Sequence, residues 1–569
     1  FDRSAKSLEL TPEIRKCFDI QATKLTPTEF INAILKAPVD LIWNGGIGTY
    51  VKATSESHAD VGDKANDSLR VNGNELRCQV IGEGGNLGVT QLGRIEFGLN
   101  GGAINTDFID NAAGVDCSDH EVNIKILLND VVTSGDMTDK QRNKQLEEMT
   151  DTVSEMVLTN NYRQTQAISI AEQQVNARMG EYRRFINTME SSGRLDRGLE
   201  FLPDEETLLE RQTKGQSLTR PELSILISYA KVMLKEELAD SDVPEDEYMM
   251  ASVENAFPPV LRKKFRDQMY NHILKREIVA TQVANKMVND MGINFCLRLM
   301  EATGSTAGQV AKAYATASEI YELEDYWNAV ESQDFKIPAE VQLELMTMMM
   351  RRVRRAARWF LRNRRNHLAP AVEIKSFGEP IKNLVRALPK LLSGEPKDEW
   401  ESECATLTEQ GVPKSIAQVA SIPATLYAGM GMVEAANESG KSIEKVAEFH
   451  MALGEKLGLH WFATQIADVK VESYWQSMAR EAFMDDLESQ MRTLTVSLIR
   501  LAGDRYTTLE VISLWMEQHE VLVNRWRGMI NELQGAPGTD FAMFSVALRE
   551  LLDLAQASVH CESFDSPPK

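Results

Sequence analysis

Glycine is concentrated near the start of this 569-residue chain, and this uneven distribution constrains the fold more than any other feature. Fourteen of the 34 glycines lie between Gly45 and Gly114, and the other 20 are spread over the 455 residues that follow. Glycine permits sharp turns and close backbone approaches, whereas it weakens the interior of a helix. We therefore predict a mixed α/β front part and a long helical rear part, with ligand-contacting backbone in the front.

Residues 80–90, VIGEGGNLGVT, are the clearest sign of a ligand crevice in the front part. An apolar run predicts a buried strand over residues 78–81, and the glycines after it permit a turn close to a ligand. A second strand is predicted over residues 39–43, followed by a polar segment of helical potential over about residues 58–70. This order predicts a βαβ unit with parallel strands, whose carboxyl ends form the usual ligand crevice.

Composition and charge exclude several classes of protein. A net charge of −22 and a pI near 5.0 argue against general binding to nucleic acid or anionic membranes and favour a soluble, cytoplasmic protein. No apolar run approaches the roughly 18 residues that span a bilayer, and the start shows no signal-peptide pattern. The six cysteines form no CxxC pair, which favours free thiols and argues against a structural zinc site: Cys17, Cys78, Cys117, Cys296, Cys404 and Cys561.

The rear part has an almost continuous helical pattern from Ser118 onward. Thr219 and Glu222 form a capping-box pattern that opens a helix over residues 223–238. Further amphipathic helices are predicted over residues 342–362, 441–457, 471–501 and 508–533. No fixed-period repeat is found, which argues against a regular solenoid.

Ser118 has two compatible interpretations. Ser118 and Glu121 form a capping-box pattern, so the hydroxyl is predicted to cap a helix that runs to about Val132. The same hydroxyl could face a pocket, where the backbone donors of a helix N-terminus would also favour an anion.

Two other kinds of site find little support in the sequence. Cys117, Asp119, His120 and Glu121 resemble a metal cluster, but adjacent helical residues point in different directions, so no metal site is predicted. The sequence has no Walker P-loop and no GxGxxG motif, so the glycine-rich turn alone is equally compatible with a structural loop.

Residues 351–365, RRVRRAARWFLRNRR, hold eight arginines in an acidic protein. One interpretation is a site for nucleic acid or an anionic effector. The overall negative charge favours the other, a helix whose arginines pair with acidic neighbours. In that helix Val353, Trp359, Phe360 and Leu361 are predicted to be buried.

Several long segments together resemble glutamate dehydrogenase, in particular its very large bacterial NAD-specific group. They are VDLIWNGGIGTYVK at 39–52, residues 83–95, NAAGVDCSDHEVNIKILL at 111–128, LTRPELSILISYAK at 218–231 and RRAARWFLRNRR at 354–365. The resemblance covers the whole chain and implies that it is the C-terminal portion of a longer protein. It implies an α/β Rossmann-like part over residues 1–135, the distal half of a doubly wound parallel sheet with a pocket helix. A large all-α domain for assembly or regulation would follow over residues 136–569.

The resemblance also implies roles for individual residues. Cofactor-binding positions would be Gly45, Gly46, Glu83, Gly84, Gly85, Asn86 and Asn111. Among these, Asn86 would contact the nicotinamide ribose and Asn111 the nicotinamide carboxamide. Val115 and Ser118 would line the pocket for the glutamate side chain, with Ser118 hydrogen-bonded to the γ-carboxylate. Gly85 replaces the alanine of smaller relatives, and Asp116-Cys117 also departs from their pattern.

The implied activity is the oxidative deamination of L-glutamate to 2-oxoglutarate and ammonia with NAD, in a homo-oligomer without nucleic-acid or membrane partners. The family's catalytic lysine and aspartate and its GxGxxG turn are expected upstream, so no catalytic residue is assigned here and the chain alone is expected to be inactive. Two alternatives stay open. One is a non-enzymatic helical scaffold with a degenerate α/β front, and the other is a dehydrogenase of another amino acid.

Overall fold

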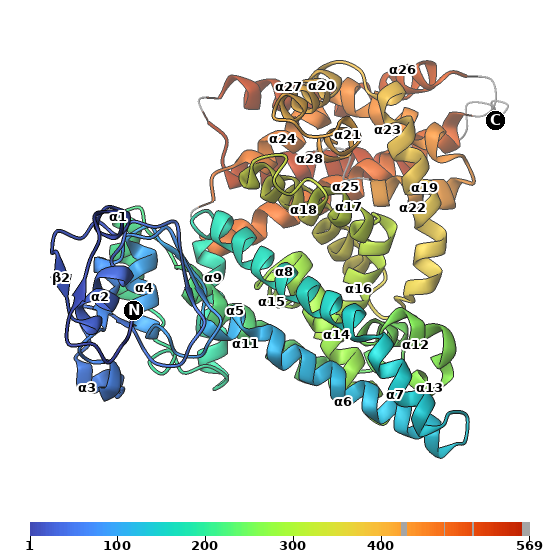
Figure 1. Ribbon diagram of the computed structural model, residues 1–569. Coiled ribbons are helices and arrows are strands. Elements are labelled where there is room, and N and C mark those ends of the chain that lie inside the picture. The colour runs from blue at the N-terminus through green and yellow to red at the C-terminus, as the bar shows by residue number, and fades with distance from the viewer. Residues whose placement is uncertain (423–428, 472, 503–505, 537, 560–569) are drawn as a thin grey trace. The chain divides into compact units, whose positions relative to one another are not determined.

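The computed structural model describes residues 1–422, 429–471, 473–502, 506–536 and 538–559. The chain forms two compact units, Phe1–Arg298 and Leu299–Lys569 (Figure 1). This boundary separates compact bodies, whereas the predicted boundary near residue 135 separates an α/β dinucleotide-binding part from an all-α domain. The latter therefore stays a prediction.

A small parallel sheet lies in the first unit, with strand order β3-β6-β7. Its strands are β3 (Leu41–Asn44), β6 (Val80–Glu83) and β7 (Ala103–Ile104). Leu41 pairs with Val80 and Asn44 with Glu83, so β3 and β6 end at the same level. The predicted parallel pairing is confirmed, although β6 begins two residues later than expected. Cys78 is buried but lies before the strand.

The helical potential predicted over residues 58–70 is confirmed only in part. The structure has only α3 (His58–Val61) and the 3₁₀ turn η1 (Lys64–Asn66), flanked by the parallel pair β4 (Val51–Lys52) and β5 (Val71–Asn72). Gly62 ends α3 in the left-handed region, with φ of 76°. The buried Arg70 then donates hydrogen bonds to the carbonyls of Thr49 (2.8 Å) and Asp63 (2.6 Å), which holds an irregular loop in place.

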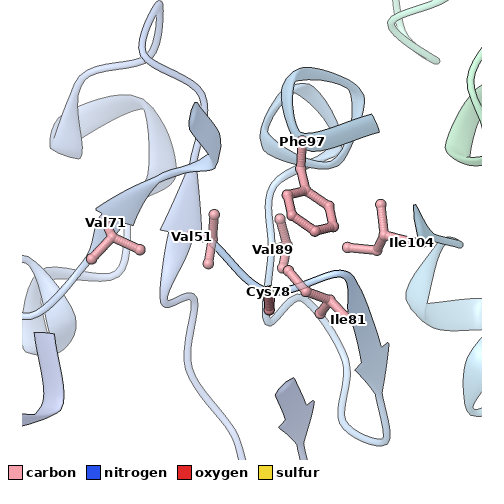
Figure 2. Close-up of a cluster of buried hydrophobic side chains, with 7 residues drawn as sticks. All are labelled: Val51, Val71, Cys78, Ile81, Val89, Phe97 and Ile104. Atoms are coloured by element: carbon pink, nitrogen blue, oxygen red, sulfur yellow. The ribbon is translucent and has the colours of Figure 1, made fainter. Parts of the chain in front are cut away.

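The helix α4 (Gln91–Leu99) supplies the apolar cover of this sheet. Its Phe97 packs in a cluster with residues from the strands and turns, and Figure 2 shows Phe97 and Ile104 turned toward each other. The full cluster is Val51, Val71, Cys78, Ile81, Val89, Phe97 and Ile104. Because β6 and α4 share this core, the glycine-rich turn between them is held at both ends.

The rest of the first unit is helical except for a short antiparallel pair near its start. Before β3 come β1 (Leu8–Glu9), α1 (Pro12–Cys17), β2 (Lys24–Leu25) and α2 (Pro27–Leu35), and η2 (Gly73–Glu75) precedes β6. After β7 come α5 (Asp107–Asp110), α6 (Ala112–Thr133), α7 (Asp139–Glu148), α8 (Thr150–Val175), α9 (Met179–Ser191), α10 (Glu205–Thr213), α11 (Arg220–Ala239), η3 (Val243–Glu245), η4 (Met249–Ala256), α12 (Pro259–Lys264), α13 (Arg266–Tyr270) and α14 (Lys275–Met291). The Thr219–Glu222 capping box is confirmed at the start of α11. The helix α15 (Phe295–Thr303) begins in this unit and ends in the second.

The second unit is entirely helical in its described residues. Its helices are α16 (Ala307–Ile320), α17 (Leu323–Glu331), α18 (Ala339–Asn363), α19 (Pro370–Leu391), α20 (Glu395–Glu409), α21 (Lys414–Ala420), α22 (Gly429–Ser439), α23 (Ile443–Leu457), α24 (Leu459–Asp468), α25 (Tyr474–Ala502), α26 (Thr508–Gln518), α27 (Glu520–Gly535) and α28 (Phe541–Val559). Three predicted helices correspond to α18, α23 and α25. The helical pattern predicted over residues 508–533 is confirmed, except that the chain breaks at His519 and forms two helices, α26 and α27. The large all-α part is confirmed.

The arginine-rich segment belongs to α18, and the interpretation of paired arginines with a buried apolar face is confirmed. Val353, Trp359, Phe360 and Leu361 are buried. Arg364 pairs with Glu373 at 3.0 Å and with Glu434 at 2.7 Å. No helix in the described ranges is long and apolar enough to cross a membrane.

Candidate functional site

The two glycine-containing turns predicted to meet a ligand lie side by side at the ends of β3 and β6. The backbone N–H groups of Gly84 and Gly85 donate to the carbonyl of Asn44, at 2.9 and 3.1 Å. A Cβ atom on Gly85 would lie 2.5 Å from the carbonyl oxygen of Gly46. Glycine at position 85 therefore lets the turn of Gly45 and Gly46 approach the turn of Gly84 and Gly85.

The two asparagines assigned to the cofactor also lie together. Asn111 Nδ2 donates a hydrogen bond of 2.7 Å to Asn86 Oδ1, at an exposed position. Asn86 extends from the turn after β6, and Asn111 occupies the position before α6. The chain between them folds so that two amides 25 residues apart form one polar patch beside the glycine turns.

Glu83 is buried beneath this turn, and its carboxylate is fully engaged. Arg94 of α4 donates from Nε (2.7 Å) and Nη2 (3.0 Å) to the two carboxylate oxygens. The backbone N–H of Val89 donates to Oε1 at 3.0 Å. Burial raises the pKa of the Glu83 carboxyl, and the Arg94 guanidinium opposes that shift by favouring the ionised form. Glu83, at the start of the turn, thus accepts a hydrogen bond from Val89 near its end, and this contact holds the turn closed.

Two aspartates that the sequence analysis did not identify complete this buried network. Asp107 Oδ2 accepts from the N–H of Leu87 at 2.8 Å, and its Oδ1 lies 3.3 Å from Arg94. Leu87 has φ of 57°, a left-handed conformation that this hydrogen bond helps to hold. Asp110 Oδ2 accepts from the N–H of Glu83 at 3.0 Å. Arg94 on the apolar face of α4 was the available signal, because a buried arginine requires an acidic partner.

The pocket pair Val115 and Ser118 lies on α6, three residues apart and therefore on one helix face. Val115 is 68% exposed, and Ser118 is exposed as well. The predicted capping role of Ser118 is wrong, because α6 begins at Ala112 rather than near Ser118. The Ser118 hydroxyl instead donates to the carbonyl of Gly114 at 3.2 Å, within the helix. The argument that helix-terminal N–H groups assist Ser118 therefore fails.

The helices α8 and α11 brace this region from the side. Arg220, in the segment that resembles the family at residues 218–231, donates to Asn105 (3.1 Å) and pairs with Glu172 (2.7 Å). Asn105 in turn donates to Asp110 at 2.8 Å. The segment thus supports the buried network under the turn.

The residues that resembled a metal cluster point to separate partners. His120 is buried and its Nδ1 lies 2.9 Å from the carbonyl oxygen of Ala256, whereas Glu121 forms an ion pair with Lys125. Among the residues that the structure describes, no group of three His, Cys, Asp or Glu side chains could hold a metal ion. The five described cysteines are free thiols, and Cys561 lies outside the described residues.

Comparisons with known proteins point to one family. Residues 215–553, more than half of the chain, match the family model for the C-terminal region of glutamate dehydrogenase, and residues 1–171 match the catalytic domain of bacterial NAD-glutamate dehydrogenase. The chain is 53% identical over 560 residues to the NAD-specific glutamate dehydrogenase of Pseudomonas aeruginosa, covering 98% of this chain and 35% of that protein. It is 47% identical over 558 residues to the NAD-specific glutamate dehydrogenase of Halomonas elongata, covering 98% and 34%.

A third relative has a lower sequence identity to this chain. The chain is 35% identical over 564 residues to the NAD-specific glutamate dehydrogenase of Mycobacterium tuberculosis, covering 98% of this chain and 35% of that protein. It thus spans about a third of the length of the curated relatives that it matches. From the two family models and these relatives, the chain belongs to the glutamate dehydrogenase family.

Proposed function

We propose that this chain forms part of an NAD-dependent glutamate dehydrogenase that converts L-glutamate to 2-oxoglutarate and ammonia. The observation that carries the proposal is the juxtaposition of Asn86 and Asn111 beside the paired glycine turns at the ends of β3 and β6. The names of the relatives and the match of both parts of the chain to glutamate dehydrogenase models support it.

The residues present fit a dinucleotide. Gly85 allows the turns after β3 and β6 to approach each other, and the two amides offer donors and acceptors at an exposed surface beside them. When bound, NAD would accept a hydride from the substrate. In this proposal β3, β6 and β7 are strands from the distal half of a doubly wound sheet. Their parallel order and the ligand-facing carboxyl ends of β3 and β6 support that assignment.

Glu83 has a positioning role in this proposal rather than a direct contact with NAD. Its carboxylate already accepts from Arg94 and from the Val89 N–H, and it has no exposed surface. It would fix the turn that carries Gly84, Gly85 and Asn86. Asp107 and Asp110 would share this role from the adjacent helix α5.

Val115 and Ser118 would form one wall of the substrate pocket, since both are exposed on the same face of α6. The catalytic lysine and aspartate of the family, which polarise the substrate and move protons, would come from sequence outside residues 1–569. The proposal includes a homo-oligomeric enzyme in the cytoplasm, with residues 136–569 serving assembly or regulation. The net charge of −22 and the free described thiols support that location.

The test is glutamate-dependent reduction of NAD by the purified longer protein that contains this chain, followed by absorbance of the reduced nicotinamide. We expect turnover with glutamate and little with leucine or aspartate. Faster turnover with leucine or aspartate would mean that this other amino acid, and not glutamate, is the substrate. No turnover with any of the three, from folded protein, would favour the scaffold alternative.

A further inference from the structure

The second unit contains a small apolar cavity with one buried arginine in its wall. The cavity has a volume of about 160 Å³, and its walls come chiefly from α16, α18, α19 and α21 of the helical unit (Figure 1). Its apolar lining includes Ile320, Met349, Ile381, Leu384, Leu388 and Val419. An apolar cavity of about 150 Å³ is large enough to hold benzene. The size and the lining therefore fit the apolar body of a small organic molecule of about six carbon atoms.

The buried arginine is Arg352 of α18, which is 3% exposed and lines the cavity. It forms no ion pair with a carboxylate in the part of the chain that the structure describes. Its Nη2 atom donates to the carbonyls of Ala420 and Ile422 at the end of α21. Carbonyls at a helix C-terminus carry only partial negative charge, so they balance the guanidinium only in part. A buried arginine normally has a full counter-charge, which is missing here.

Two of the three guanidinium nitrogens of Arg352 have no hydrogen-bonding partner among the described residues. Nε is excluded from solvent and unpaired, and Nη1 forms no hydrogen bond either. Unlike Nε, Nη1 is not excluded from solvent, so it is the donor that a ligand in the cavity can reach. Buried polar groups without partners are rare in native proteins and can mark a place where a ligand supplies the partner.

The other charged side chains on the cavity wall do not supply the missing negative charge. They are Glu322, Lys382 and Arg386. Glu322 pairs with Lys382 at 2.8 Å, so its charge is already balanced. Arg386 is exposed, donates to Asn383 at 3.3 Å and forms no ion pair within the described ranges. The wall therefore keeps an excess of positive charge, with Arg352 as its buried member.

We propose that this cavity binds a small apolar monocarboxylate, with its carboxylate on Arg352 and its hydrocarbon body against the apolar lining. Hydrogen bonds from a guanidinium to a carboxylate are among the strong ones in proteins. One buried cation matches one negative charge, and a second anionic group would be buried without a partner. The ligand would contact α18, α19 and α21 together. All lining residues belong to the second unit, so the site is separate from the residues assigned to NAD and glutamate.

The test uses calorimetric titration of the purified full-length enzyme at neutral pH, with hexanoate as the probe. We expect saturable binding with one site per chain. Hexanol and hexylammonium have the same apolar body without the negative charge, and both should bind at least tenfold more weakly than hexanoate.

Two variants separate the cation from the cavity. Arg352→Gln should weaken hexanoate binding tenfold or more and leave hexanol binding nearly unchanged. Val385→Phe adds bulk at a half-buried position on the cavity wall and should weaken the binding of both probes. Lys375→Gln is the matched control, because Lys375 is an exposed cation on α19 that does not line the cavity. Its affinity for hexanoate should equal that of the unmodified enzyme.

If Arg352→Gln lowers the apparent Tm of the unliganded enzyme, Val385→Phe still tests the site, since it leaves Arg352 and its bonds to α21 in place. Equal affinity for hexanoate and hexanol would show an apolar cavity without anion recognition and would overturn the proposal. The absence of saturable hexanoate binding would overturn it as well. So would equal hexanoate affinity in Val385→Phe and Lys375→Gln, because the probe would then bind elsewhere.

Discussion

Buried arginines serve different purposes in the two units. In the first unit, Arg94 is enclosed by Glu83 and Asp107 and organises a backbone turn, so the presented surface consists of glycines and neutral amides. In the second unit, Arg358 of α18 is similarly buried and paired with Asp485 and Glu481 of α25, whereas Arg351 on the same helix is exposed. A buried arginine thus holds a backbone turn in the first unit and joins two helices in the second. Five predictions, ordered by expected effect, test this contrast and the site beside it.

The largest effect is expected from Arg94→Met. It would leave Glu83 and Asp107 buried without their shared cation, which typically costs about 3–5 kcal/mol. The apparent Tm of the purified enzyme should fall clearly, together with affinity for NAD. Arg351→Gln, at an exposed position of α18, should change stability by less than about 1 kcal/mol. Equal Tm values for the two variants would contradict the expectation that the buried Arg94 stabilises the fold and that the exposed Arg351 does not.

Arg358→Met should destabilise the second unit, but by less than Arg94→Met destabilises the first. Glu481 and Asp485 would lose a partner, yet Asp485 would keep Arg362 at 2.8 Å, so we expect a loss of about 2–3 kcal/mol. Calorimetric unfolding of the full enzyme measures this. A stability loss as small as that of Arg351→Gln would mean that the buried ion pairs of Arg358 contribute no more to stability than an exposed arginine does.

Gly85→Ala should weaken NAD binding about tenfold or more. The new Cβ would lie 2.5 Å from the Gly46 carbonyl oxygen, and relieving such overlap costs about 1–3 kcal/mol. The dissociation constant for NAD is the quantity to measure. Gly180→Ala is the control, because nothing lies within 4 Å of its added Cβ. Unchanged NAD affinity in Gly85→Ala would show that the two turns need not touch.

Asn86→Ala and Asn111→Ala should each weaken NAD binding several-fold. Because the two amides share a 2.7 Å hydrogen bond, the double variant should lose less affinity than the two single losses combined. A double-mutant cycle on the NAD dissociation constant measures this coupling. Strictly additive losses, or no loss in Asn86→Ala, would argue that the asparagine patch is structural.

The smallest effect is expected from Ser118→Ala, which should raise KM for glutamate about twofold while lowering kcat little, because water can replace this exposed hydroxyl. A lost hydrogen bond to a charged group costs about 1.5–3 kcal/mol at most, and part is regained from water. Ser134→Ala is a matched control, since its hydroxyl also donates to the carbonyl four residues earlier, at 2.9 Å. An unchanged KM in Ser118→Ala would remove this residue from the pocket.

Local patterns predicted much of the fold because they act over a few residues. Thr219 and Glu222 bond to each other's backbone across one helical turn, so the start of α11 was readable without any tertiary information. The apolar and polar alternation of α18, α23 and α25 has the same local origin. Over residues 58–70 only two short helical pieces form. Gly62 ends the first, and Arg70 is held by carbonyls of Thr49 and Asp63, contacts that no local pattern contains.

In the candidate site, too, local patterns predicted some features and tertiary contacts determined others. The resemblance singled out Asn86 and Asn111, but their hydrogen bond depends on how β6 and α5 are placed. Arg94 and Asp107 were missed because a charged residue on a helix face is usually exposed, and only a buried partner reverses that expectation. Ser118 was misplaced as a cap because Asn111 and Ser118 both satisfy the local signal for a helix start, and only the structure shows that α6 begins at Ala112.

Residue patterns alone indicated the family, the glycine-rich turns, the helical character of the rear part and the capping box at the start of α11. Each of these depends on residue types close together in the chain, where backbone geometry and hydrogen bonding are local. The tertiary contacts were needed to show that the buried Glu83 supports the glycine-rich turn and that Arg358 and Arg351 have different surroundings on one helix. Those outcomes depend on burial and on partners distant in sequence, because a charge is costly inside a protein unless another part of the chain supplies its counter-charge.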